Sequence, residues 1–173
     1  NRFLRYKMTA LIASFIFIVL AEMGDKTQLL AMAFSAKYSA HKVLIAVFLA
    51  TLLNHSLAVA VGRFLTVLIP MEIISFIAAL SFIVFGLWTI RGDALHGEEK
   101  KEPRFGPVLT VGIAFFLAEM GDKTQLATVS LAVEYRNMLN VLMGTTLGMV
   151  VADAIGIMIG VVMRKHIPEE SIK

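Results

Sequence analysis

The 173-residue chain has no cysteine, a single tryptophan, four prolines and few charged residues. The lack of cysteine excludes disulfides and thiolate metal sites. Charged residues make up 17% of the chain and hydrophobic residues 58%, whereas a soluble domain averages about 25% charged and about 45–50% apolar residues. This balance indicates a membrane protein. The net charge of +3 comes mostly from loops and chain ends, so we do not expect nucleic-acid binding.

What the chain does contain is a nine-residue sequence that occurs twice. Residues 21–29 read Ala-Glu-Met-Gly-Asp-Lys-Thr-Gln-Leu, and residues 118–126 repeat these letters 97 positions later. Each copy lies inside a long apolar segment, where charge is costly and marks a functional site by default. The two copies of Glu-x-Gly-Asp, with four carboxylates between them, predict one site that is built from two halves.

Apolar segments of about 20 residues, long enough for a helix to cross a bilayer, recur along the chain. Five spans are predicted, at residues 8–36, 43–69, 73–90, 107–133 and 141–163. Pro70 is expected to end the second span, because proline cannot continue a helix, and Pro107 is well placed to begin the fourth. We therefore predict an all-α, multi-pass protein of the lipid bilayer.

The spans are arranged as two repeats. Ile69-Pro70 in the first half matches Ile167-Pro168 in the second, and in the first half this pair precedes an uncharged span. We predict an inverted repeat of two three-helix units: residues 8–91, a hydrophilic linker at 92–106, and an incomplete second unit at 107–173. Three helices per unit would give the units opposite orientations, with the site near the midplane. The sixth helix is missing from this chain, and we expect the intact protein to continue with about 20 apolar residues.

The spacing of the acids suggests cation chemistry. Glu22 and Asp25 would share one face of a continuous helix, as would Glu119 and Asp122. Two such pairs facing each other would form a carboxylate cage for a hard divalent cation such as calcium, magnesium or manganese. The glycine in each motif allows close backbone approach or local unwinding. Because clustered carboxylates repel one another, an empty cage should bind protons that an arriving cation expels, which predicts cation/proton exchange.

The two motif lysines admit two interpretations. Lys26 and Lys123 follow Glu22 and Glu119 by four residues, a favourable spacing for an ion pair on a helix. They either neutralise buried acids or act as tethered cations that occupy the acids when no metal is bound.

Other polar side chains at membrane depth support the predicted site. The motif methionines are either soft ligands that suit manganese or packing residues. Aligning Gly62 with Gly160 places His55 at the position equivalent to Asp153. Asp153 is either a fifth acid of the transport pathway or a proton-relay group. His55 is either a group that titrates near neutral pH or a hydrogen-bonded structural residue. The supporting residues are Met23, Lys26, Thr27, Gln28, Asn54, Met120, Lys123, Thr124, Gln125 and Asp153.

These residues resemble a known family. Glu-x-Gly-Asp-Lys-Thr in the first helix of each of two three-helix repeats is similar to the signature of the Golgi manganese/calcium transporter family and its bacterial manganese-exporter relatives, which resemble the lysine-exporter superfamily in plan. The resemblance runs from the first motif to the Ile-Pro after the fifth span. It implies export of manganese, with calcium as a second candidate, out of the cytoplasm in exchange for protons and without a prosthetic group. The family's acids and polar neighbours correspond to residues 22, 25–28, 119 and 122–125 of this chain.

The resemblance also implies a prokaryotic member in the cytoplasmic membrane, and the distribution of lysine and arginine favours a cytoplasmic linker. Two other classes of function remain to be separated from an exchanger. An intramembrane aspartyl protease also carries Gly-Asp pairs, but Glu22 and Glu119 stand where its motif has a glycine, so we predict that the chain is not an enzyme. A passive cation channel or an organic-solute exporter on the same scaffold is the second alternative. A homodimer is one candidate assembly, although the sequence indicates no dimer face.

Overall fold

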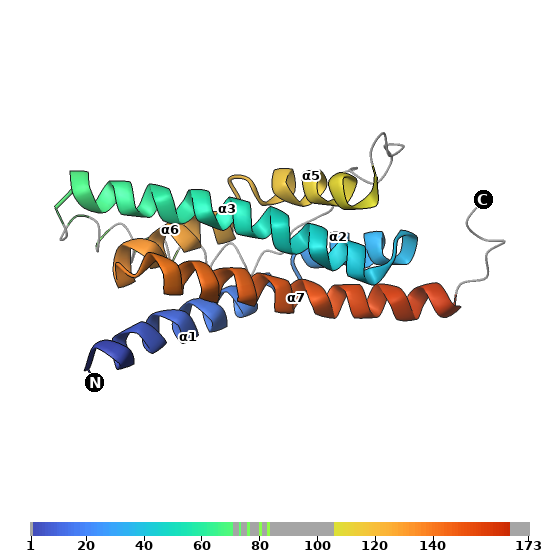
Figure 1. The fold of residues 1–173 in the computed structure, drawn as a ribbon, viewed down its shortest axis with the longest axis horizontal. Coiled ribbons are helices and arrows are strands. Elements are labelled where there is room, and N and C mark those ends of the chain that lie inside the picture. Colours follow the sequence, from blue (N-terminus) through green and yellow to red (C-terminus); the bar gives the residue numbers. More distant parts are fainter. Residues whose placement is uncertain are drawn as a thin grey trace.

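The chain is folded into α-helices joined by short turns (Figure 1). A computed structural model describes residues 2–70 and 106–166, together with positions 73, 76, 80 and 83. These ranges hold no strand, and their helices are α1 (Arg2–Glu22), α2 (Lys26–Lys37), α3 (Ala40–Leu68), α5 (Pro107–Glu119), α6 (Lys123–Tyr135) and α7 (Met138–His166). The all-α prediction is confirmed for this part of the chain. Most of the predicted third span, residues 92–105 of the linker and Ile167-Pro168 lie outside the described residues.

Each predicted motif span is broken into two helices. The axes of α1 and α2 differ in direction by 73° across the break that follows Glu22, and α5 and α6 are separated in the same way after Glu119. Each of the predicted spans at 8–36 and 107–133 thus consists of two helices, because the motif inside it forms a turn. The prolines act as expected: Ile69 caps the end of α3 just before Pro70, and Pro107 occupies the first turn of α5.

The lengths and surfaces of the helices suit a bilayer. Among the described residues, α3 and positions 138–163 of α7 are long and apolar enough to cross a membrane, and the bent pair α1–α2 passes the same test as one broken span. The 13-residue helix α5 is apolar but short. Large apolar side chains are also exposed on the outside of the bundle, among them Ile16, Leu53, Phe64, Leu147 and Met158. Such a surface is suited to lipid rather than to water.

The two halves of the chain are interlaced. Helix α7, from the second half, packs along α1 and α2, whereas α3, from the first half, packs along α5 and α6. The helices α3 and α7 also pack against each other in the centre. In Figure 1, α1 and α2 run from the N-terminus at the left towards the right, and α5 and α6 run the opposite way. Each broken unit is therefore supported by the long helix of the other half.

Small residues at four-residue spacing, interrupted on α3 by Asn54, allow this close packing. On the buried faces of α3 and α7 they are Ala46, Ala50, Ala58 and Gly62, and Gly144, Gly148, Ala152, Gly156 and Gly160. A Cβ atom on Gly62 would lie 2.8 Å from the Cβ of Ala132 on α6. Gly160 occupies the corresponding place on α7 and contacts Ser35 and Met32 of α2. Small residues at helix interfaces bring backbones close together in membrane proteins, which positions the motif breaks against the long helices.

Candidate cation site

Each motif forms a tight turn between two helices. In the second copy Met120 has φ −66° and ψ 116°, Gly121 has φ 78°, and the Asp122 N–H donates to the Glu119 carbonyl over 3.2 Å. These values define a type II β-turn, whose third residue needs a positive φ that glycine adopts readily. The first copy is equivalent, with φ 81° at Gly24 and a bond of 3.0 Å between the N–H of residue 25 and the carbonyl of residue 22. The expected local unwinding at the glycines is present.

The aspartates stand at the start of the second helix of each unit. Asp25 and Asp122 are the N-cap residues of α2 and α6, in extended conformation with φ −80° and −77°. The Asp25 side chain accepts a bond of 2.6 Å from the Lys26 N–H. Carboxylates are favoured at N-caps because free N–H groups and the helix dipole face them. The expectation that Glu22 and Asp25 share a helix face is thus wrong, since the two acids lie on opposite sides of a turn.

The glutamates end the first helix of each unit and are held by threonines. Glu22 accepts a hydrogen bond of 2.7 Å from the Thr27 hydroxyl, and Glu119 accepts one of 2.7 Å from Thr124. Both glutamates are buried, and the second carboxylate oxygen of each has no hydrogen-bond partner among the described residues. Each glutamate therefore keeps one oxygen available in the interior.

The motif glutamines link each turn, by hydrogen bonds, to the long helix of the other half. The Gly24 N–H donates to the Gln28 side chain over 2.8 Å, and the Gln28 amide donates to the Ala152 carbonyl on α7 over 2.9 Å. In the second unit the Gly121 N–H donates to Gln125 over 2.6 Å, and the amide of Gln125 donates to the Asn54 side chain on α3 over 3.3 Å. Asn54 in turn donates to the Phe116 carbonyl over 3.0 Å. Side-chain patterns do not reveal a carbonyl partner such as that of Ala152, so sequence reasoning missed this link.

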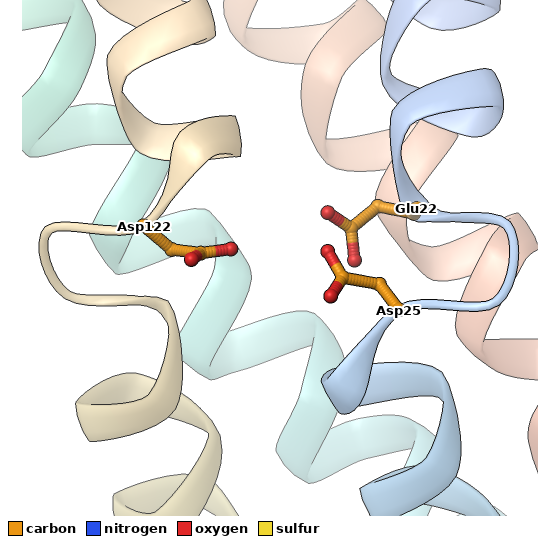
Figure 2. A group of neighbouring side chains, drawn as sticks. All are labelled: Glu22, Asp25 and Asp122. Atoms are coloured by element: carbon orange, nitrogen blue, oxygen red, sulfur yellow. The ribbon is translucent and has the colours of Figure 1, made fainter. Parts of the chain in front are cut away.

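Three of the four predicted acids meet in the centre of the bundle. Carboxylate oxygens of Glu22, Asp25 and Asp122 all lie within 4.8 Å of one another, and all three residues are buried. Figure 2 shows that Glu22 and Asp25 approach from the first break and Asp122 from the second. Glu119 stays outside this group, although it is near enough to Asp122 and Asp25 to interact with their charges.

The motif lysines cross between the two halves. Lys26 Nζ lies 2.9 Å from Asp122 Oδ1, and Lys123 pairs with Asp25. The expected pairing with the glutamate four residues earlier is therefore wrong, because the turn removes the helical spacing on which it relied. Each lysine instead neutralises the aspartate of the opposite motif.

The other predicted residues divide between the centre and the surface. Met23 and Met120 are about half exposed, and the Met23 sulfur accepts a weak hydrogen bond from Gln28 over 3.9 Å. The structure does not group these thioethers with the buried acids. Asp153 and His55 are buried on α7 and α3, and neither side chain has a hydrogen-bond partner among the described residues.

Two broken helices that bring buried charges together between long apolar helices are typical of secondary transporters. The family model described as divalent cation/proton antiporter GDT1 matches residues 10–96 and 107–173. The chain belongs to this family, which confirms the resemblance inferred from the doubled motif.

Individual relatives agree with the family match. A Vibrio cholerae protein named "Putative manganese exporter" is 39% identical over 163 residues, covering 93% of this chain and 81% of the relative. A GDT1-like protein of Synechocystis is 30% identical over 186 residues, covering 95% of this chain and 89% of the relative. GDT1-like protein 3 of Oryza sativa is 27% identical over 190 residues, covering 94% and 67%. No solved structure matches the chain. The protein is thus a membrane transporter of divalent cations and not an enzyme, as predicted.

Proposed function

We propose that this protein exports manganese from the cytoplasm in exchange for protons, with calcium as a second substrate, through a site made by the two motifs. The observation that carries the proposal is the meeting of Glu22, Asp25 and Asp122, whose oxygens lie within 4.8 Å although they come from opposite halves. Manganese and calcium both accept oxygen ligands. The name of the Vibrio cholerae relative supports manganese as the first choice.

Glu119 completes the proposed set of four acids. Its free oxygen is buried, and its charge acts on the aspartates of both motifs. Thr27 and Thr124 fix the two glutamates, while the glutamines hold the turns in place.

The crossed lysines suggest how the charge of the site is balanced when no metal is bound. Two lysine charges on two aspartates equal the charge of one divalent cation. In this tethered-cation mechanism, the arriving metal replaces both ammonium groups, and the lysines return when it leaves. The alternative is that the lysines only neutralise buried acids and stay in place when the metal binds.

The exchange with protons follows from the crowding of acids. The two lysines offset only two of the clustered carboxylates, so the remaining acids of the empty site bind protons and the metal expels them. The opposite directions of the two broken units in Figure 1 support an inverted repeat with alternating access to the two sides. We place the protein in the cytoplasmic membrane of a prokaryote, with the linker in the cytoplasm.

The test uses the intact protein in sealed proteoliposomes. Manganese and calcium uptake is followed under an imposed pH gradient for the wild type, Glu22→Gln and Glu119→Gln, with Glu134→Gln as the matched control because Glu134 is exposed at the end of α6. We expect gradient-driven flux that either motif change abolishes and the control retains. Unchanged flux in both motif variants would refute the site. Metal flux that moves no protons would instead indicate a channel.

A further inference from the structure

Asp153 is a buried acid that lies outside both motifs. It is the only charged residue from Met138 to Met163, its exposed fraction is 0%, and neither carboxylate oxygen has a hydrogen-bond partner among the described residues. An ionised carboxylate without a partner costs several kcal/mol when it is removed from water. A neutral carboxyl group costs much less. The surroundings of Asp153 therefore favour the form that carries a proton.

The charged side chains that act on Asp153 from the packed helices also favour the protonated form. They are acidic: Glu22 at the end of α1, Asp25 at the start of α2 and Glu119 at the end of α5. The nearby motif lysines are paired with aspartates rather than with Asp153. On α3 the equivalent position holds His55, whose ring nitrogens have no hydrogen-bond partner among the described residues.

Asp153 is mechanically linked to the first motif. The preceding residue, Ala152, accepts the hydrogen bond from Gln28, and Gly156 one turn later packs against the Gln28 backbone. Gln28 also holds the turn that presents Glu22 and Asp25. A cation bound at this turn therefore acts on Asp153 in two ways. The charge of the cation acts on the carboxylate, and any shift of the turn reaches α7 through Gln28.

We propose that Asp153 is a proton-binding site, separate from the cation site, that carries an exchanged proton. When the cation leaves, the uncompensated acids of the motifs favour a proton on the Asp153 carboxylate. When a divalent cation binds between Glu22, Asp25 and Asp122, its charge offsets these acids, and the Asp153 proton is released to water. This inference rests on the proposed cation/proton exchange.

The test measures protons released when manganese binds. Intact protein in detergent and weak buffer is titrated with manganese chloride while a pH indicator reports release and calorimetry reports binding. Asp153→Asn should bind manganese and release one proton fewer per bound ion than the wild type. His55→Asn, the matched change at the equivalent position, should release as many protons as the wild type. In proteoliposomes, Asp153→Asn should exchange labelled for unlabelled manganese as the wild type does, but gain less extra uptake than the wild type under a pH gradient.

The outcomes separate the two proposals. Wild-type proton release from Asp153→Asn would overturn the inference, and so would a deficit found in His55→Asn instead. Loss of manganese binding by a monodisperse Asp153→Asn protein would make Asp153 a cation ligand and also overturn it. If the wild type itself released no protons, the proposed exchange would fail and the proton site with it.

Discussion

The crossed ion pairs differ in how deeply they are buried. The Lys26 side chain is 28% exposed and its partner Asp122 is 3% exposed, whereas Lys123 and Asp25 are 4% and 1% exposed. Two identical motifs thus have different surroundings, which is expected if the site opens to one side at a time. In this structure Lys26 is the more exposed of the two lysines.

This difference predicts unequal effects of removing the lysines. Without metal, Lys123→Gln should lower the free energy of unfolding by about 3–5 kcal/mol, because it leaves Asp25 buried beside other acids. Lys26→Gln should cost less, since its pair is partly exposed and screened by solvent. Thermal unfolding in detergent, with and without manganese, measures both effects.

The same experiment separates the two interpretations of the lysines. If bound metal replaces the lysines, manganese should remove most of the stability difference between each variant and the wild type. A difference that stays the same with and without manganese would show that the lysines only neutralise the acids.

At the scale of helices, small residues decide how closely the long helices approach the broken units. Gly62 on α3 has no space for a side chain, since a Cβ would also lie 2.9 Å from the Val129 carbonyl. Gly112 on α5 is a suitable contrast, because its nearest neighbour would be the Ala46 carbonyl at 3.9 Å.

Gly62→Ala should therefore destabilise the protein by about 1–3 kcal/mol, as overpacking does. Gly112→Ala should be neutral or slightly stabilising, because alanine favours helix more than glycine does. Melting temperatures of the two variants in one detergent provide the comparison. Equal melting temperatures would contradict the close packing of α3 on α6.

The sequence predicts the elements better than their contacts. The apolar segments and prolines correctly indicate α3, α7 and the start of α5, and the doubled motif indicates four buried acids. The sequence indicates the turn at Gly24 only as local unwinding, because helical periodicity inside an apolar segment hides a break of three residues. Once the helix breaks, the spacing from Glu22 to Lys26 no longer predicts a contact. The partner of Lys26 lies in the other half of the chain, which a pattern of neighbouring residues cannot reveal.

At the scale of the whole molecule, the described helices of the two halves share one interior. The long helix of each half packs along the broken unit of the other, and the acids of the site come from both. Stability and cation binding should therefore be properties of the assembled pair.

Separate expression of the halves tests this. A fragment ending at residue 91 and a fragment from residue 92 onward should each be degraded or self-associate, because a packed face of α3 or α7 is left uncovered. Their co-expression should restore a monodisperse species that binds manganese. Gel filtration and calorimetry in detergent give the result, and a stable monomeric first fragment would contradict the interlaced packing.

The interlaced packing also sets an order of events during synthesis. Helix α3 is complete at Leu68, but α6, which covers part of its small-residue face, ends only at Tyr135. At about 5–20 residues per second, the interval between these two points lasts on the order of several seconds. During this time Asn54 lacks the partners that it later finds at Phe116 and Gln125. The insertion machinery therefore has to accommodate this polar side chain in the nascent chain, and a ribosome that stalls between the halves leaves Asn54 without these partners.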